Sequence, residues 1–135
     1  MNKKLVDALL PDAVTVLKKV GIANEKNEID KNFRGQISSF GAAVSAGSLL
    51  AAAAFFNEQA GAKNDRSKLM TAINLLLEAH GLTDCKGENL FDTIRNTPAG
   101  QQRSLKDDVL ACAVALKLAM NLYKLNSDEK QKAGD

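Results

Sequence analysis

The spacing of apolar residues constrains the fold of this chain more than any other feature of its sequence. Along most of the 135 residues, apolar side chains recur at steps of three or four, with glycine and proline marking the interruptions. Such spacing gathers apolar side chains on one face of an α-helix, whereas a half-buried strand requires strict alternation. No hairpin signal and no internal repeat competes with this pattern. The sequence therefore predicts an all-α fold, a compact bundle of five to six helices.

Chain length limits this bundle to a single domain. A chain of 135 residues fits one domain and buries enough surface for a core without disulfide or metal support. We expect that domain to span residues 1–125. The remaining segment, 126–135, is charged and has no apolar anchor, so we expect it to be a disordered tail.

Two helices are predicted in the N-terminal third. The first ends at Gly21, and Pro11 within it implies either a kink or a helix that starts there. The polar residues 24–31 predict a loop, with Asp30 as the N-cap of the second helix. The apolar positions are Leu5, Leu9, Ala13, Val16, Leu17 and Val20 in the first helix, and Phe33, Ile37, Phe40 and Val44 in the second.

An uncharged stretch at residues 35–57 raises the question of a membrane span. Gly47 and Ser48 break it into two helices, and the second, at about 48–59, is apolar around most of its circumference. A membrane span requires about 20 apolar residues, but the longest unbroken apolar run here is residues 49–56. A buried helix at the centre of the bundle is therefore favoured over contact with a membrane.

Two more helices are predicted before residue 97. After a loop at 61–64, Asn64 or Asp65 is expected to cap the first of them, and Gly81 to end it. A short helix follows at 88–96. Their inward-facing positions are Leu69, Ile73, Leu76 and Leu77, and then Leu90, Phe91 and Ile94.

The last helix has two candidate starts. Thr97 followed by Pro98 is typical of an N-cap and first helical position, while Ser104 and Asp107 have the spacing of a capping box. In either case we expect the helix to run to about Leu125. Its apolar face is formed by Leu105, Val109, Cys112, Leu116, Met120 and Tyr123.

Residues suited to catalysis are scarce. His80 is the only histidine, and the two cysteines match no zinc spacing. No phosphate-binding loop, calcium loop or metalloprotease motif occurs, and the sequence predicts no enzyme, metal or cofactor. One alternative is a cysteine hydrolase, which requires His80 within hydrogen-bond distance of Cys85 or Cys112.

The N-terminus and the cysteines predict a cytoplasmic protein. The sequence Met-Asn-Lys-Lys begins like a signal peptide, but Asp7, Pro11 and Asp12 interrupt the apolar region that should follow. Two cysteines in a chain of this length are typical of small buried apolar residues in a reducing compartment.

Three small groups of basic residues are the candidate contacts for a nucleic acid. Each brings positive charges together on one helix face or at a helix start, where they can bind a sugar–phosphate backbone. The alternative is ordinary solvated surface. The net charge is only +2, so most of the affinity must come from elsewhere. The groups are Lys31 and Arg34; Lys63, Arg66 and Lys68; and Arg103 and Lys106.

Residues 33–56 contain a recognisable order of residue types. An aromatic residue comes first, followed by the pair Phe40-Gly41 and the aliphatic Val44. A glycine and a leucine then lead into an alanine-rich segment that ends in phenylalanine. This pattern resembles the small helical subunit of the type III-B CRISPR–Cas effector, the Cmr (RAMP module) RNA-targeting complex. The final helix, 110–125, is similar to that family's closing helix. Two departures are Gly41, where the family has proline, and Ser48, which separates the glycine from the leucine. The pattern residues are Phe33, Phe40, Gly41, Val44, Gly47, Leu49, Phe55 and Phe56.

The resemblance implies non-catalytic work in antiviral defence. Members of that family stack in several copies into a minor filament beside the subunits that carry the guide RNA, and they help to hold target RNA against it. The resemblance therefore implies three kinds of partner: other Cmr subunits, further copies of this chain, and the backbones of guide and target RNA. Base pairing reads the sequence, so the protein needs to recognise only backbone and shape.

A helical adaptor or homo-oligomeric scaffold that binds only protein is the second hypothesis. It is favoured if the seven basic residues scatter over the folded surface, whereas RNA binding is favoured if they share one or two faces.

Overall fold

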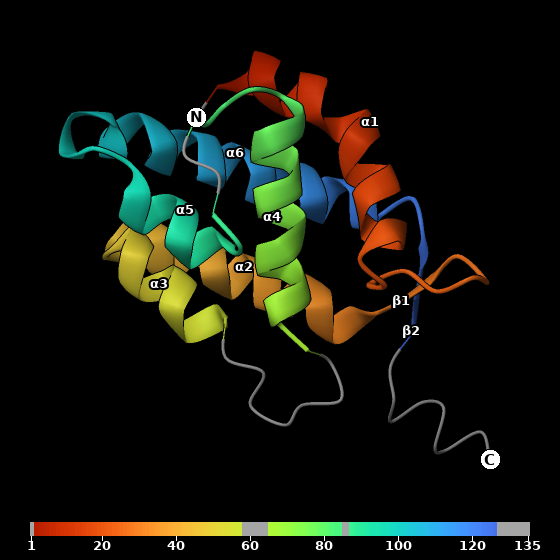
Figure 1. Cartoon of the computed structure of the whole chain (residues 1–135). Helices are drawn as coiled ribbons and strands as arrows, with labels where there is room; N and C mark the ends of the chain where they lie inside the picture. Colours follow the sequence, from red (N-terminus) through yellow and green to blue (C-terminus); the bar gives the residue numbers. More distant parts are fainter. Residues whose placement is uncertain (1, 58–64, 85–86, 127–135) are drawn as a thin grey trace.

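The computed structural model describes residues 2–57, 65–84 and 87–126. Within them the chain forms six α-helices, one turn of 3₁₀-helix and a parallel pair of three-residue strands, which confirms an all-α bundle (Figure 1). The elements are α1 Lys3–Lys19, β1 Glu28–Asp30, α2 Lys31–Ala46, α3 Leu49–Phe56, α4 Ser67–Ala79, α5 Leu90–Asn96, the 3₁₀ turn Ala99–Gln101, α6 Gln102–Met120 and β2 Lys124–Asn126.

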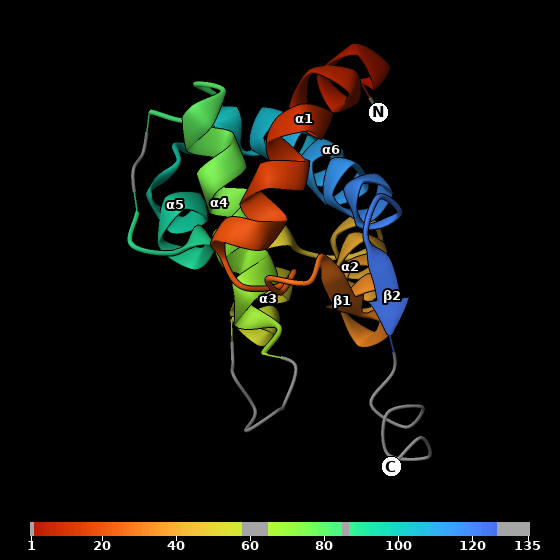
Figure 2. The same ribbon diagram turned by 90° about the vertical axis from the view of Figure 1, so that its right-hand side faces the viewer.

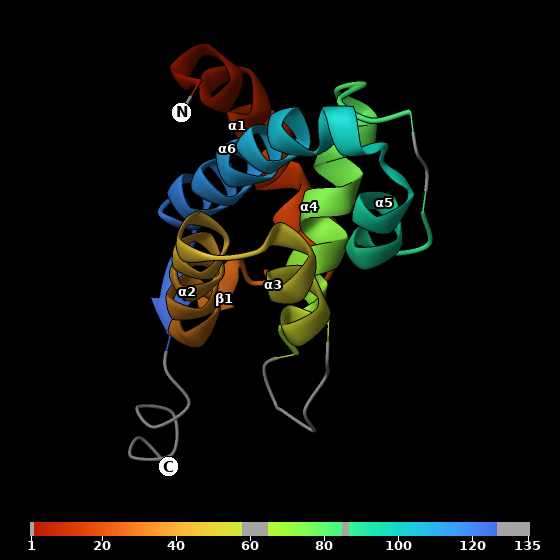
Figure 3. The same cartoon turned by 90° about the vertical axis from the view of Figure 1, so that its left-hand side faces the viewer.

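The centre of the bundle is α6. It lies between α1 and α2 and also packs against α4 (Figures 1 to 3). Its buried residues include Ala111, Cys112, Ala115 and Ala119, and these small side chains let three neighbouring helices approach its backbone closely. The predicted inward positions from Leu105 to Met120 are all buried.

The prediction that the alanine-rich helix is central is wrong. That helix, α3, has only eight residues and packs with one face against α2, α4 and α5. Its other face reaches solvent, with Leu50 38% and Phe55 59% exposed. An alanine loses little when it is exposed, since a methyl group buries little area, so a run of alanines indicates a helix but not its depth.

The first two helices largely follow their predicted faces. Helix α1 begins at Lys3, so Pro11 lies inside it and does not start it. Gly21 follows its end with φ +83°, a left-handed conformation that favours glycine. In α2 the four predicted positions are buried, and the Asp30 side chain accepts a hydrogen bond from the Asn32 amide, as expected for the N-cap.

The two strands correct both the predicted loop and the predicted end of the last helix. Helix α6 ends at Met120, and Glu28, Ile29 and Asp30 then pair in parallel with Lys124, Leu125 and Asn126 (Figure 2). Tyr123 lies beyond the helix and donates its hydroxyl to the Val14 carbonyl at 2.6 Å. Strands of three residues are too short to show alternation, and their partners are far apart in the sequence.

The start of α6 also differs from both candidates. Thr97 donates its hydroxyl to the Thr93 carbonyl at 2.7 Å, so it ends α5 and does not cap α6. Helix α6 begins at Gln102, whose side-chain amide donates to the Ile94 and Thr97 carbonyls at 2.8 Å.

Other boundaries agree with the sequence. Gly47 ends α2, and the Ser48 hydroxyl caps α3 by accepting from the Ala51 amide. The Asp65 carboxylate accepts from the Ser67 amide at the start of α4. In α5, Phe91 is only partly buried and Thr93 takes a buried position. The predicted loop 61–64 with Asn64, and the tail beyond Asn126, lie outside the described residues. The helices formed by the described residues include none with both the length and the hydropathy of a membrane span.

Candidate nucleic-acid interface

Arg103 and Lys106 share a hollow with the start of α3. The corner Gly47–Leu50 forms one side of it and the first turns of α6 form the other, enclosing about 370 Å³. Arg103 is exposed and Lys106 partly exposed. The first amides of α3 add a partial positive charge at the same place. This arrangement is suited to an anion such as a phosphate.

Arg66 and Lys68 lie at the start of α4, and both already have partners. The Arg66 guanidinium carbon stands 4.4 Å from the centre of the Phe55 ring and 5.7 Å from that of Phe56, a cation–π arrangement. The Lys68 ammonium donates a hydrogen bond to the carbonyl of Gly21, which follows the end of α1, at 3.4 Å. The third member of this group, Lys63, lies outside the described residues.

Lys31 and Arg34 occupy the first turns of α2. Lys31 is exposed, while Arg34 is partly buried and its Nε atom has no hydrogen-bond partner. At about 1.5 Å per residue, the length of α2 places Lys31 about 24 Å and Arg34 about 20 Å from the hollow at the other end of this helix. The candidate basic residues that the structure describes therefore lie at three separate places. Of these, Arg103 and Lys106 line one hollow together.

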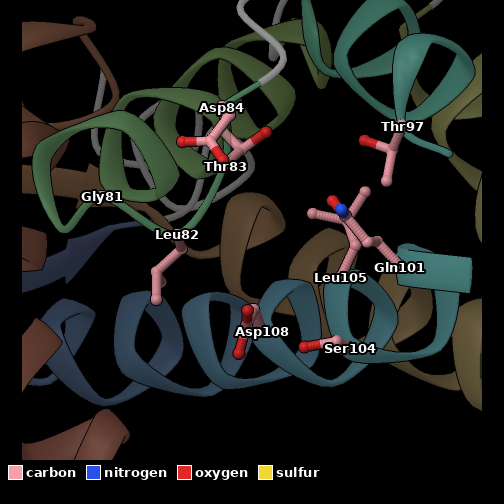
Figure 4. Close-up of a pocket in the computed structure, with 9 residues that line it drawn as sticks. All are labelled: Gly81, Leu82, Thr83, Asp84, Thr97, Gln101, Ser104, Leu105 and Asp108. Atoms are coloured by element: carbon pink, nitrogen blue, oxygen red, sulfur yellow. The ribbon is translucent and has the colours of Figure 1, made fainter.

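A second, polar hollow lies between the loop after α4 and the start of α6, with a volume of about 190 Å³. Figure 4 shows Asp84 on the loop and Asp108 on α6 at opposite sides of it. Burial and the neighbouring Asp107 raise the pKa of Asp108. No group of three metal-binding side chains occurs among the described residues.

The surroundings of His80 and Cys112 argue against the cysteine hydrolase in the form that uses Cys112 as its thiol. The His80 Nε2 atom pairs with the Asp12 carboxylate at 2.6 Å, which links α4 to α1. Cys112 is fully buried in α6, and burial raises its thiol pKa to about 12, so the reactive thiolate is strongly disfavoured. Cys85 lies outside the described residues.

The family-pattern residues divide into core and surface. Phe33, Phe40, Val44, Leu49 and Phe56 are buried, and Phe40 and Phe56 meet edge to face with ring centres 5.3 Å apart. Phe55 is exposed and Gly41 is partly buried, and a Cβ atom added at Gly41 would meet no atom within 4 Å outside the neighbouring turns of its own helix. The pattern thus encodes mainly packing. The exposure of Phe55 was missed, because its apolar neighbours in the sequence suggest burial.

Comparison with known families gives a match over most of the chain. Residues 11–120, from within α1 to the end of α6, match the family described as CRISPR-associated protein (Cas_Cmr5). No curated protein and no solved structure matches the chain.

Proposed function

The chain belongs to the Cas_Cmr5 family of CRISPR-associated proteins, and from this premise we propose that it is a non-catalytic subunit that helps to hold target RNA. As a member of that family it is a small subunit of a Cmr complex. In the proposal, several copies stack into a minor filament beside the subunits that carry the guide RNA, in the cytoplasm. They retain the target strand while it pairs with the guide, as part of antiviral defence.

One observation carries the RNA contact: Arg103 and Lys106 share the hollow at the start of α3. A phosphate there would meet two cations and the amide end of a helix. The net charge of +2 suits a subunit that adds a few contacts per copy, because repeated copies supply avidity. Lys31 and Arg34 are a second, separate contact in this proposal. Arg66 and Lys68 are less available because they already contact Phe55 and Gly21.

The first test asks whether the chain assembles as proposed. The tagged protein is purified from its host, and the proteins and small RNAs that accompany it are identified. We expect other Cmr subunits together with guide RNAs that share a repeat-derived end. Recovery of neither would overturn the proposal, whatever the behaviour of the basic residues.

The second test addresses the hollow itself. In a reconstituted complex, Arg103→Glu with Lys106→Glu should weaken binding of target RNA. It should also flatten the slope of log K against log salt by about 0.7 for each phosphate of a single strand that the protein no longer neutralises. The matched control is Lys3→Glu with Lys4→Glu, an equal charge change at exposed residues of α1. Equal effects of the two double variants would show that the hollow binds no phosphate.

The protein-only adaptor remains the second candidate because of one observation. The candidate basic residues that the structure describes lie at the starts of three different helices, α2, α4 and α6, and a scatter of these residues is the arrangement that favours an adaptor. The adaptor predicts that the purified chain brings protein partners without RNA, and that both double variants leave those partners bound.

A further inference from the structure

Phe55, near the end of α3, is an exposed aromatic ring. The five phenylalanines and the tyrosine of the chain all lie within the described residues, and the chain has no tryptophan. Of these six rings Phe55 alone is exposed, at 59%, while the others are buried or partly buried. A large apolar side chain gains free energy when it is removed from water. The exposed ring is therefore a place where a ligand that covers it would be favoured.

Two neighbours fix the orientation of this ring. The Arg66 guanidinium carbon stands 4.4 Å from the centre of the Phe55 ring, in a cation–π arrangement that covers one face. The buried Phe56 ring lies at 71° to it, with 5.5 Å between the ring centres. Figure 3 shows the end of α3 beside the start of α4, where Arg66 is the N-cap residue. Because one face is covered, the exposed area lies mainly on the opposite face and the edge, where a planar group can stack.

An uncharged strip of α3 connects this ring with the hollow at the start of the same helix. The exposed Ala51 and Ala54 lie between Leu50, which lines the hollow, and Phe55. None of the eight residues of α3 is charged, so the strip does not repel phosphates. At about 1.5 Å per residue, Leu50 and Phe55 are about 7.5 Å apart along the helix. A stacked strand rises about 3.4 Å per nucleotide, so about two nucleotides separate a phosphate in the hollow from a base at the ring.

The groove between α2 and α6 is less suited to a nucleotide. It has a volume of about 350 Å³, with Gly41 on one wall and Leu110 on the other. Its described lining contains no aromatic side chain, and its cation, Lys117, is accompanied by the carboxylate of Asp107. At α3, by contrast, an aromatic face lies beside a guanidinium and near a pair of cations.

We propose that Phe55, held in place by Arg66, stacks on an unpaired base of the target RNA whose backbone binds at the hollow. The inference rests on the proposed function and deepens it, because it names a group of the RNA that the subunit contacts besides the phosphates. The base is unpaired, since a base within a duplex is already stacked on its neighbours and only a splayed-out base can reach a ring. Every base has a π-face, so this contact favours no particular sequence.

The decisive test distinguishes an aromatic ring from an ordinary apolar side chain. Phe55→Leu keeps an apolar side chain at the surface but removes the π-face. In a reconstituted complex it should weaken binding of target RNA at least about fivefold, whereas Phe55→Trp, with a larger ring, should bind at least as tightly as the wild type. The matched control is Phe91→Leu on α5, a partly buried ring with a guanidinium carbon 5.9 Å from its centre, which should leave the affinity unchanged. Equal affinities of the Phe55→Leu and wild-type complexes would overturn the inference.

The composition of each complex must be known before affinities are compared. Leucine is a better helix former than phenylalanine, so Phe55→Leu should leave α3 folded. Native mass spectrometry of the complexes should therefore find the Phe55→Leu chain in the same amount as the wild-type chain. Loss of this variant from the complex would show that the ring contacts another protein, and the stacking inference would be wrong.

A set of target RNAs, each with one abasic nucleotide, identifies the base. Removal of an unpaired base leaves both the phosphates and the pairing with the guide in place. At the contacted position we expect an abasic target to lose at least about fivefold in affinity for the wild-type complex and to lose nothing further for the Phe55→Leu complex. At paired positions the two complexes should lose affinity equally. Equal losses for the two complexes at every position of the target would refute a contact between the ring and a base.

Salt dependence separates failure of the inference from failure of the proposed function. Stacking neutralises no phosphate, so Phe55→Leu should lower the affinity and leave the slope of log K against log salt unchanged, whereas Arg103→Glu with Lys106→Glu should flatten that slope. A flattened slope for Phe55→Leu would contradict stacking. If the double variant flattens the slope and Phe55→Leu has no effect on affinity, the inference alone fails. If complexes with and without this chain bind target RNA equally, the proposed function fails.

Discussion

At Gly87 the chain passes so close to α5 that no larger residue fits. A Cβ atom there would lie 2.5 Å from the Thr93 nitrogen and 2.7 Å from the Asp92 Cβ. The Gly87 amide donates to the Thr93 hydroxyl, which donates in turn to Asn74 at 2.8 Å. This network connects the loop after α4 with both α4 and α5.

We therefore expect Gly87→Ala to destabilise the protein. The added methyl group must displace backbone, a change that costs about 1–3 kcal/mol. The control is Gly100→Ala, where nothing lies within 4 Å, and this variant should unfold within about 0.5 kcal/mol of the wild type. Urea denaturation of both variants checks the difference, and equal midpoints would contradict it.

The Glu28 carboxylate is one group through which the stability of the protein depends on pH. Hydrogen bonds from Asn126 and Asn24 lower its pKa below the usual 4.5. A pKa that is lower in the folded state gives stability that is present above the unfolded pKa and is lost as pH falls through the folded pKa.

The Glu28→Gln variant should reveal this contribution. Its unfolding free energy should fall below that of the wild type at pH 7, and the gap should narrow as the pH is lowered below about 4.5. Urea denaturation at a series of pH values measures the gap. A gap that stays constant down to pH 2 would show that the carboxylate charge is not the cause.

At the scale of elements, β2 connects the C-terminal part of the described chain to the N-terminal part by pairing with β1. Ile29 at the middle of β1 is fully buried, and the Glu28 carboxylate accepts from the Asn126 side chain at 2.6 Å. The strand also follows Tyr123, whose hydroxyl bonds to α1. Segments from both ends of the described chain thus support one another.

Truncation tests the contribution of β2. A chain that ends after Tyr123 loses the strand pairing and should have a lower unfolding free energy, with faster hydrogen exchange at the amides of β1. A chain that ends after Asn126 keeps the pairing and serves as the control. Identical exchange in the two truncated chains would show that the strand pair adds no stability.

Elements with a local signal were predicted from sequence, and those that depend on distant partners were not. Gly21, Asp30 and Ser48 mark helix ends through their own backbone preferences or side chains, so these boundaries were found. β1 was interpreted as loop because its hydrogen bonds go to residues near the other end of the chain. Thr97 followed by Pro98 has a strong local signal, but the Thr97 hydroxyl bonds to Thr93 instead.

The candidate site was predicted only in part, for the same reason. Spacing along a helix brings Arg103 and Lys106 together, and the structure places them in one hollow. Spacing does not reveal that Arg66 lies over Phe55 or that Lys68 reaches Gly21, since these contacts join different helices. The groove between α2 and α6 could not be predicted from the sequence, because it depends on how these two helices pack against each other.

At the scale of the whole molecule, the free energy of unfolding depends on the packing of α6 against α1, α2 and α4. Leu116 is fully buried and Leu118, two residues on, is 44% exposed. Leu116→Ala should therefore cost about 2–5 kcal/mol, because it leaves a cavity where the helices meet. Leu118→Ala should cost less than about 1 kcal/mol. Thermal unfolding of both variants measures the difference, and similar midpoints would contradict the central position of α6.

The position of α6 near the end of the chain also determines when the core can form during synthesis on the ribosome. Synthesis proceeds from the N-terminus, so α1, α2 and β1 emerge well before the helix and the strand that cover them. Until α6 and β2 leave the exit tunnel, α1 and α2 lack the helix against which each packs most extensively, and β1 lacks the strand with which it pairs. Nascent chains are therefore exposed to chaperones, proteases and premature aggregation for most of translation.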